Sequence, residues 1–273
     1  MKTEAIAYNG ITVYHVSGRI KKEFWSEAYH SHEHAEIFVH VSGKMELYIE
    51  NEVYSHTGNE IRLYAPWELH FGKAAFEQDM EWYQISVNNV FLKAHPALSE
   101  KIVNREKGTG NVFISKKHDR IVSLLNEIFA KKESPLWEHY FISNITKILC
   151  ILNEPENNID VKEGKNECLQ VILDTVNRNL TNIKTVDDIS ALTHFSPSYV
   201  HRLFRTNLNI TPHQYIIMKK LSAAKEKLEK GCNITDVCFD SGFNDYSNYI
   251  TTFRKHFGIT PKRFQRGCMQ DHN

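Results

Sequence analysis

The sequence lacks several features that would place it in a common class of protein. Its apolar runs are all shorter than the roughly 20 residues that cross a bilayer, and the start, MKTEAIAYNG, has no apolar signal-peptide core. No two of its five cysteines form a CxxC pair, which argues against a zinc finger and a disulfide framework. The formal net charge is zero, with only a slight basic excess in residues 166–273. We therefore expect a cytoplasmic protein with reduced thiols and no membrane segment.

What the chain does contain is enough hydrophobic residues, 41% of 273, for two buried cores. Apolar and polar residues alternate with period two from residue 11 to residue 90. The runs EIFVHV, NEIRLYA and EWYQISV read as strands, and MELYIENEVYSH reads as a hairpin around Asn51. Turn residues such as Ser42-Gly43 and Pro66 separate these runs. Short strands at such intervals predict a β-barrel or jelly roll.

The period becomes helical at about residue 116. The run HDRIVSLLNEIF places four apolar residues on one face, and a second helix is expected from Pro135 through FISNITKILCIL. These helices carry enough apolar surface to pack on the barrel and also against a second copy of the chain. The alternative is that they only cover the barrel. Residues 154–166, EPENNIDVKEGKN, are polar, with little periodicity, and are predicted to be a linker.

From residue 167 onward the pattern is helical throughout, and it contains an internal repeat. DDISALTHFSPSYVHRLFRTNLNITPHQY aligns with TDVCFDSGFNDYSNYITTFRKHFGITPKRF. Each copy reads as a short helix, a turn, a second helix and an Ile-Thr-Pro triplet that opens a third helix, which is the helix-turn-helix plan. Gly242 stands in the second turn, where a positive φ is expected, and His194 stands at the matching place in the first. Three N-cap and proline pairs begin helices at Ser196, Thr211 and Thr260.

The second helix of each copy is predicted to have one apolar and one outward face. The outward residues of the first copy are Ser198, His201, Arg202 and Arg205, and those of the second are Ser247, Ile250, Thr251 and Arg254. Arginine, histidine and serine at helical spacing suit contacts to base edges and phosphates in the major groove of DNA. A solvated helix surface is the alternative. The duplication favours DNA, because two units joined by a helix of roughly 30 Å can reach successive turns of the groove.

The second copy, DVCFDSGFNDYSNYITTFRKHFGITPKRF, resembles the signature of the AraC/XylS family of bacterial transcription regulators. The matching positions are Asp236, Val237, Gly242, Phe243, Ser247, Tyr249, Phe253, Arg254, Gly258, Thr260, Pro261 and Phe264. The resemblance implies a seven-helix DNA-binding domain with two helix-turn-helix units, and activation through recruitment of RNA polymerase. Thr251 departs from the family, which often has arginine there, and Cys238 stands where alanine is usual. The first departure predicts looser reading of bases by the second copy.

The stretch YHSHEHAEIF, residues 29–38, concentrates histidine and glutamate. Alternate residues of an extended strand share a face, so His30, His32 and Glu36 can point together, with His70 arriving from another strand. Three histidines and a carboxylate match the ligands of metal-dependent cupin enzymes. Polar contacts to an organic effector, or histidines that pair across the barrel wall without a ligand, are the other interpretations. His34 and His40 are expected to be structural or to face solvent.

Residues 10–90 also resemble, more loosely, the cupin-like sensor barrels of the AraC/XylS family. The elements that match include the histidine stretch, Glu36, the Val41-Ser42-Gly43 turn, Gly58, Pro66 and His70. Aromatic residues nearby suit stacking on a sugar ring. We therefore predict that a small-molecule effector, with carbohydrate as the suggested class, contacts His30, His32, Glu36, Tyr64, Trp67 and His70. No metal and no cofactor is predicted.

These observations predict an α+β chain of two domains. Residues 1–153 would form a cupin-like barrel (a jelly roll) with two packing helices that also dimerise, 154–166 a linker, and 167–273 an all-α domain with two helix-turn-helix units. The predicted function is a cytoplasmic regulator, expected to be an activator, that binds specific DNA under the control of a small molecule. Its expected partners are DNA, RNA polymerase and a second copy of the chain. The alternative is a metal-dependent cupin enzyme, or a metal sensor, fused to a DNA-binding module.

Overall fold

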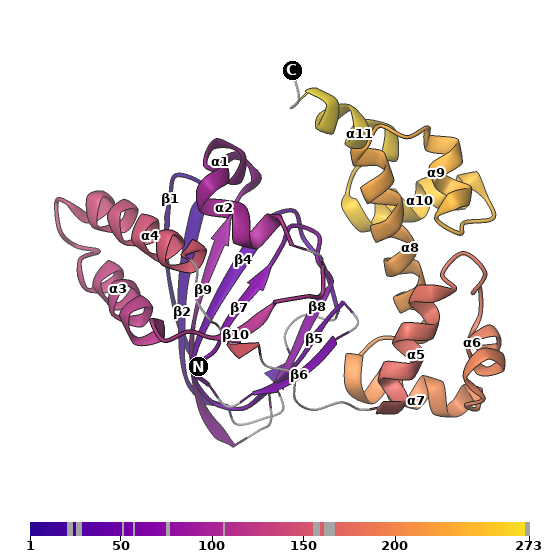
Figure 1. Cartoon of the computed structure of the whole chain (residues 1–273), viewed down its shortest axis with the longest axis horizontal. Coiled ribbons are helices and arrows are strands. Elements are labelled where there is room, and N and C mark those ends of the chain that lie inside the picture. Colours follow the sequence, from indigo (N-terminus) through magenta and orange to yellow (C-terminus); the bar gives the residue numbers. More distant parts are fainter. Residues whose placement is uncertain are drawn as a thin grey trace. The chain divides into compact units, whose positions relative to one another are not determined.

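The computed structural model of the chain describes residues 1–20, 24–25, 29–50, 52–56, 58–74, 77–105, 107–154, 159–160 and 167–270. The chain divides into two compact units, Met1–Asn166 and Glu167–Asn273 (Figure 1). Most of the predicted linker, residues 155–158 and 161–166, lies outside the described residues. None of the helices in the described ranges is long and apolar enough to cross a membrane.

The N-terminal unit is built on two antiparallel sheets. The larger sheet has the order β1-β2-β9-β4-β7-β10-β11, with bounds Lys2–Tyr8, Ile11–Ile20, Gln78–Val87, Ala35–Ser42, Ile61–Tyr64, Val112–Ile114 and Ile159–Asp160. The smaller sheet has the order β3-β8-β5-β6, with bounds Phe24–Trp25, His70–Ala74, Met45–Ile49 and Glu52–His56. The predicted strand-rich barrel is confirmed, and β5 and β6 form the predicted hairpin.

Strand β11 lies within the predicted linker. Its two residues, Ile159 and Asp160, pair with Ile114 and Phe113 of β10. Strand β10 pairs with β7 on its other side and would otherwise leave its backbone groups unpaired at the sheet edge. This part of the linker is therefore attached to the barrel.

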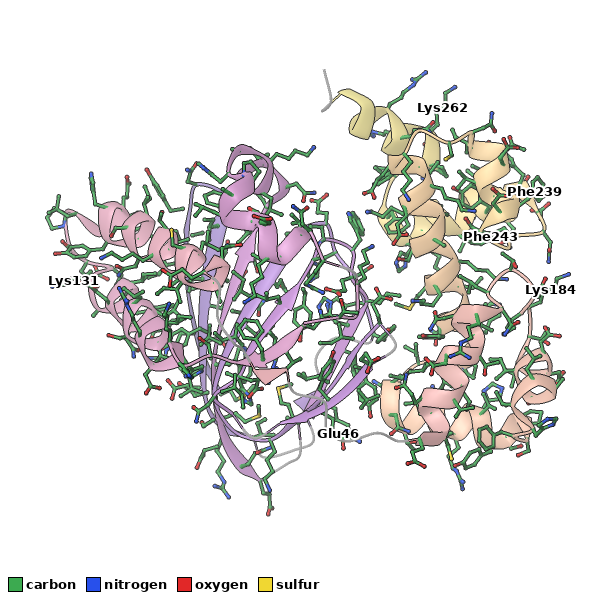
Figure 2. The ribbon with its side chains drawn as sticks, viewed as in Figure 1. Glu46, Lys131, Lys184, Phe239, Phe243 and Lys262 are labelled. Carbon is green, nitrogen blue, oxygen red and sulfur yellow. The ribbon has the colours of Figure 1, made fainter. Side chains whose placement is uncertain are left out.

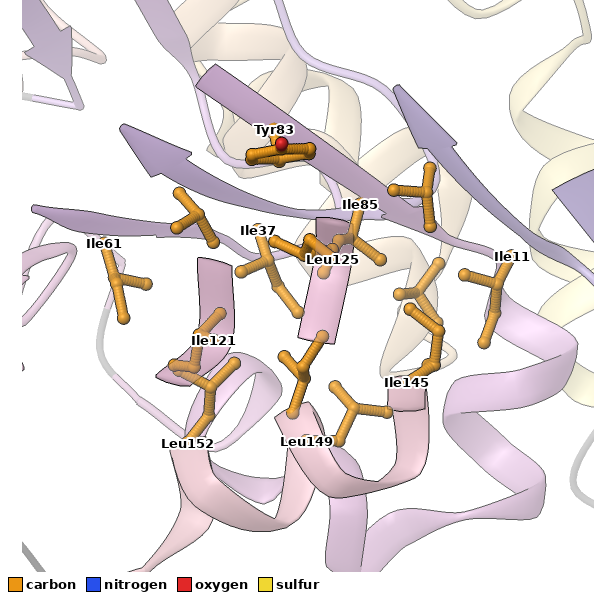
Figure 3. Close-up of a cluster of buried hydrophobic side chains, with 14 of the residues drawn as sticks. Ile11, Ile37, Ile61, Tyr83, Ile85, Ile121, Leu125, Ile145, Leu149 and Leu152 are labelled. Atoms are coloured by element: carbon orange, nitrogen blue, oxygen red, sulfur yellow. The ribbon is translucent and has the colours of Figure 1, made fainter. Parts of the chain in front are cut away.

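Four described helices cover the outer face of the larger sheet. They are α1 (Asn89–Ala94), α2 (Pro96–Val103), α3 (His118–Ala130) and α4 (Trp137–Asn153) (Figure 1). Helices α3 and α4 match the two predicted helices, whereas α1 and α2 were not predicted. Figure 3 shows the core between sheet and helices, in which isoleucines of the strands, such as Ile37 and Ile85, meet Leu125 and Leu149 of the helices. Because side chains alternate along a strand, the even-numbered neighbours of Ile37 and Ile85 face the smaller sheet.

Covering the sheet uses most of the apolar surface that suggested a dimer contact. The apolar residues of α3 and α4 that lie in the core include Ile121, Leu125, Ile145 and Leu149. Among the described residues of this hairpin, the large apolar side chains that are strongly exposed are Leu136 and Ile142. A contact of this helix pair with a second copy would therefore have only these two strongly exposed apolar side chains to bury.

The C-terminal unit consists of seven described helices (Figure 1). They are α5 (Glu167–Arg178), α6 (Val186–Thr193), α7 (Pro197–Leu208), α8 (Pro212–Glu229), α9 (Ile234–Asp240), α10 (Tyr246–Phe257) and α11 (Pro261–Gln270). The side chains of Ser196 and Thr211 accept hydrogen bonds from the backbone of the first turns of α7 and α8, as predicted. The pairs α6–α7 and α9–α10 are the two predicted helix-turn-helix units.

The two turns use the same backbone conformation with different residues. His194 ends α6 with φ at 62°, and Gly242 follows α9 with φ at 84°. A β-carbon at position 242 would lie 2.9 Å from the α-carbon of Thr181, so this turn lies close against the connection between α5 and α6. Glycine is needed at 242 both for its φ and for this close approach.

Candidate functional site

The outward face of α7 has the composition that the sequence predicted. Ser198, His201, Arg202 and Arg205 are all exposed, whereas Val200 and Phe204 on the opposite side of the helix are completely buried. The Arg202 guanidinium lies over the ring of Tyr199, 5.0 Å from its centroid, which supports the side chain without using its hydrogen-bond donors. Helix α7 therefore presents a row of free polar groups on the second helix of the first unit.

Helix α10 presents a weaker surface of the same kind. Ser247, Thr251 and Arg254 are exposed, but Ile250 is partly buried against the core of the second unit. Ile250 therefore faces outward only in part, and its contact with DNA stays a prediction. Its helical position borders that of the buried Tyr249, and packing an isoleucine there removes apolar surface from water. In Figure 2 Phe243 lies within this core, whereas Phe239 points outward from α9.

In the N-terminal unit the predicted cluster of histidines forms around Glu36. His30 and His70 are joined by two backbone hydrogen bonds of 3.0 and 2.9 Å, and their ring centroids lie 4.5 Å apart. The Nε2 atom of His32 is 3.3 Å from one carboxylate oxygen of Glu36, and that of His70 is 3.7 Å from the same oxygen. The structure thus brings together four of the six residues predicted to contact the effector. Whether they do so stays a prediction.

His34 belongs to the same cluster, although it was expected to be structural or solvent-facing. Its ring stacks on that of His32 with centroids 3.8 Å apart, and its Nε2 atom lies 3.2 Å from Glu36. The side chains of Gln84 and Ser86 also donate to Glu36, at 2.6 and 3.4 Å. His40 lies elsewhere, completely buried beside Glu60, and has a structural position.

The surroundings of Glu36 and His70 determine the protonation states of these two residues. Burial by itself raises the pKa of Glu36, but the neighbouring imidazoles of His32 and His34 outweigh it and hold this pKa well below its usual range. Burial, together with the charge of His30, lowers the pKa of His70 to about 4. Glu36 is therefore ionised and His70 neutral at pH 7.

His32 has an acceptor beside each ring nitrogen, the carbonyl of His34 at 2.9 Å and the carboxylate of Glu36. His70 differs, because its Nδ1 atom lies 2.9 Å from the carbonyl oxygen of Glu68, which assigns the proton to Nδ1 and leaves a lone pair on Nε2.

The nitrogens of His30, His32 and His70 lie within 4.8 Å of one another, so this trio could also hold a metal ion. A metal ion there would require a deprotonated nitrogen on each of the three rings.

Tyr64 and Trp67 occupy different positions from those expected of sugar-stacking residues. The Tyr64 ring is 3% exposed and stacks on His70 with centroids 4.2 Å apart, so protein already covers it. Trp67 is half-buried in the turn between β7 and β8, where its φ is 63° and its backbone N–H donates to the carbonyl of His32 at 2.7 Å. The ring of Tyr64 and the backbone of Trp67 both contact the histidine cluster.

An open hollow of about 570 Å³ borders this cluster. Its walls are Gly10, Thr12, Tyr14, Glu33, His34, Ser86, Asn88, Asn89 and Val90. Ser86 and His34 belong both to the hollow and to the surroundings of Glu36. Thr12 and Tyr14 alternate with the buried Ile11 and Val13 of β2, and therefore face away from the covering helices.

The sequence reasoning did not identify Thr12, Tyr14, Ser86 or Asn88 as site residues. The available signal was the strand alternation, which puts polar Thr12 and Tyr14 on the inner face of a strand whose other face is apolar. A hollow with hydroxyl, amide and imidazole groups can exchange many hydrogen bonds with a small polar ligand.

Comparison with known proteins agrees with both halves of this description. Residues 19–135 match the family model of an AraC-like ligand binding domain, and residues 189–267 match that of a helix-turn-helix domain. Over 242 residues, 88% of this chain and 92% of the relative, the chain is 25% identical to the probable transcriptional regulator LumQ of Photobacterium leiognathi. It is 31% identical over 88 residues, 32% of this chain and 72% of the relative, to the probable transcription factor PqrA of Proteus vulgaris.

A third relative is the lactose operon transcription activator of Staphylococcus xylosus, 27% identical over 101 residues, which cover 37% of this chain and 36% of that protein. All three relatives are named as regulators, factors or activators of transcription, which agrees with the prediction of a regulator rather than an enzyme. The chain belongs to the AraC family of transcription regulators, with a ligand-binding domain followed by a helix-turn-helix DNA-binding domain.

Proposed function

We propose that this regulator binds a two-part DNA site through α7 and α10 and activates transcription, in the cytoplasm, when a small hydroxyl-bearing effector occupies the hollow beside Glu36. The observation that carries the DNA half is the row Ser198, His201, Arg202 and Arg205, exposed on one side of α7 while the other side is buried. The exposed row supplies two guanidinium groups and an imidazole at helical spacing. Arginine can donate two hydrogen bonds to guanine, and these side chains can also contact phosphates.

Selection from a random duplex library with the full-length chain, followed by anisotropy titrations at fixed salt, tests this half. The site should contain two separate base blocks. Replacement of Arg202 or His201 by alanine should weaken binding by about 1–3 kcal/mol at particular bases of one block. Thr251→Ala should cost less, because a threonine makes at most one hydrogen bond to a base. An equal cost for Thr251→Ala and Arg202→Ala would contradict the ranking of α7 above α10.

The effector half is supported by the hydrogen-bonding groups that line the hollow. Thr12, Tyr14, Ser86 and Asn88 offer hydrogen-bonding groups around an open space, and the ionised Glu36 lies next to it through Ser86 and His34. Such a lining favours a neutral, hydroxyl-rich molecule such as a sugar over a hydrocarbon, because burying these groups against an apolar ligand would leave them without partners.

A thermal-shift screen of the full chain against sugars, polyols and small acids tests the effector class. All four tryptophans precede residue 140, so their fluorescence reports on the N-terminal unit. A sugar that raises the midpoint should lose about 1 kcal/mol of binding energy in Tyr14→Phe and in Ser86→Ala, each of which removes one hydroxyl. Stabilisation only by hydrophobic acids would refute the proposed class.

Activation, RNA polymerase and a homodimer complete the proposal. The lactose operon relative is named as an activator, which supports activation as the output. In vitro transcription from a promoter that carries the selected site should rise on addition of the chain, and a fall would show a repressor. For the dimer, sedimentation of the full-length chain and of Ile142→Glu tests the small apolar patch that α4 exposes. A monomeric wild type at micromolar concentration would remove the dimer from the proposal.

A metal-responsive regulator is the second candidate, and one observation favours it. The imidazole nitrogens of His30, His32 and His70 lie close enough together to serve as ligands, and the lone pair of His70 is already assigned to Nε2. Elemental analysis of protein purified without a metal-affinity tag tests this candidate. One transition metal per chain, lost in His30→Ala and retained in the control His139→Ala, would support it, and less than a tenth of an equivalent would remove it.

A further inference from the structure

Lys220 is a buried charged residue at the middle of α8, which is the helix that joins the two helix-turn-helix units. Only 4% of the residue is exposed. Its ammonium group donates to the carbonyl oxygen of Ile183 at 2.8 Å and to that of Gly242 at 2.9 Å. Ile183 lies in the connection between α5 and α6, before the first unit, and Gly242 lies in the turn of the second unit. One side chain thus binds both halves of the domain.

We infer that Lys220 fixes the placement of the second helix-turn-helix unit relative to the first, and thereby determines which spacing of the two DNA blocks the chain accepts. The inference rests on the proposed function, in which both units bind one DNA site. Lys220 is a positioning residue in this scheme, because its buried ammonium group contacts backbone carbonyls of the protein.

A positioning residue is needed because a single helix, α8, connects the two helix-turn-helix units. Two bodies joined by a single 18-residue helix can move relative to each other when that helix bends or twists. Hydrogen bonds from the midpoint of the helix to both bodies oppose this relative motion, since movement of either body would break a hydrogen bond to a buried charged group. Such a bond is costly to lose, because the ammonium group and the carbonyl would both be left without a partner.

The turn around Gly242 gives a second, independent sign of the same contact. A β-carbon on Gly242 would lie 2.9 Å from the α-carbon of Thr181, 3.1 Å from the carbonyl oxygen of Leu180 and 3.1 Å from the Cε atom of Lys220. The backbone of the second turn therefore rests directly on the α5–α6 connection. The equivalent turn residue of the first unit, His194, is exposed and carries a full side chain, so close packing at this turn is specific to the second unit.

Charge also agrees with a structural use of Lys220. Burial and the nearby charge of Lys184 lower the pKa of its ammonium group, while Asp188 opposes the shift. A lysine that merely covered the surface would keep its ammonium group in water. Placing it under the protein surface is compensated here by two carbonyl acceptors, one from each half of the domain.

The experiment measures tolerance to spacing. From the site selected with the full-length chain, duplexes are made with one or two base pairs inserted between the blocks, and their dissociation constants are divided by that of the selected duplex. One inserted pair rotates the second block by about 35° and moves it by about 3.4 Å, so for wild type this ratio should be about ten or more. In Lys220→Met, which keeps the length of the side chain but removes its donors, the ratio should fall to about three or less.

Two further variants make the result specific. Gly242→Ala disturbs the same contact from the other side and should reduce the ratio as well, which covers the case in which Lys220→Met does not fold. Lys227→Met is the matched control, because Lys227 stands on the same helix and donates to the carbonyl of Asp240 at 3.0 Å, but it stays within the second unit. Its spacing ratio should equal that of wild type.

The possible outcomes separate the inference from the function on which it rests. A selected site with a single block, or no site at all, would refute the proposed use of both units. A two-block site whose spacing ratio is unchanged in folded Lys220→Met and in Gly242→Ala would refute the role of Lys220 and leave the proposed function intact. Base substitutions within either block should cost the same factor in Lys220→Met as in wild type, because the reading residues are untouched.

Discussion

Mild acid should destabilise the N-terminal unit through His70. In the folded chain its pKa is lowered from 6.5 to about 4, chiefly by burial. Between these two pH values the imidazole is therefore mostly protonated in the unfolded state and mostly neutral in the folded state. Because the folded pKa is the lower one, the stability is complete above pH 6.5 and is lost as the pH falls toward 4. Linkage of these two values predicts a loss of about 2 kcal/mol between pH 7.5 and pH 5. Glu36 adds little in this range, because its pKa lies far below it.

Urea denaturation followed by tryptophan fluorescence measures this loss, since the tryptophans report on the N-terminal unit alone. The protein should first be dialysed against EDTA, so that no metal competes with protons for the imidazoles. His70→Gln should remove about 2 kcal/mol of the pH dependence between pH 7.5 and pH 5 and leave the part due to His40, whose pKa is also lowered by burial, whereas the exposed control His139→Gln should keep all of it. Parallel losses of stability in wild type and in His70→Gln would refute the reasoning, and would place the acid sensitivity in other groups such as His40.

Two further predictions concern stability. His194→Gly should stabilise the C-terminal unit by about 0.5–1 kcal/mol, because it removes a β-carbon from a residue with φ at 62°, and far-UV circular dichroism in urea would detect the gain. Glu60→Gln should destabilise the N-terminal unit by about 3–5 kcal/mol, because it leaves the buried Arg62 without its carboxylate partner 2.5 Å away. A loss below 1 kcal/mol, measured by tryptophan fluorescence, would mean that water reaches Arg62.

The parts of the fold that the sequence predicted are those with a local signal. The strands, the hairpin around Asn51 and the helix-turn-helix units have clear periods and strong turn or capping residues. Helices α1 and α2 have only six and eight residues, and each buries a single large apolar side chain, Leu92 or Ile102, so no period marks them. Strand β11 forms by pairing with the edge of β10, and the sequence of residues 154–166 contains no signal for this pairing.

The same distinction applies to the candidate sites. The stripe on α7 was predictable because its residues share one helix, whereas the hollow draws on β2, β9, the segment just before β4 and the start of α1. Ile250 lies at the border of its helix face, so the sequence did not show that its side chain would be partly buried against the core. Lys220 reads as an ordinary surface lysine in the sequence, and the two carbonyls that bury it come from segments 37 and 22 residues away.

The duplicated units are unequal in a way that makes the positioning role of Lys220 useful. The first unit offers two exposed arginines and a histidine on α7, whereas α10 offers Thr251 and Arg254 with Ile250 turned toward the core. If the second helix-turn-helix unit bound its block of bases independently of the first, it would lose much of its binding energy to the entropy of orientation. Under the proposed function, a second unit already held against the first by Lys220 and Gly242 would meet its block at a high effective concentration, so that even a few contacts would add affinity. The poorer surface of α10 would then still select DNA, by the position of its block more than by its bases.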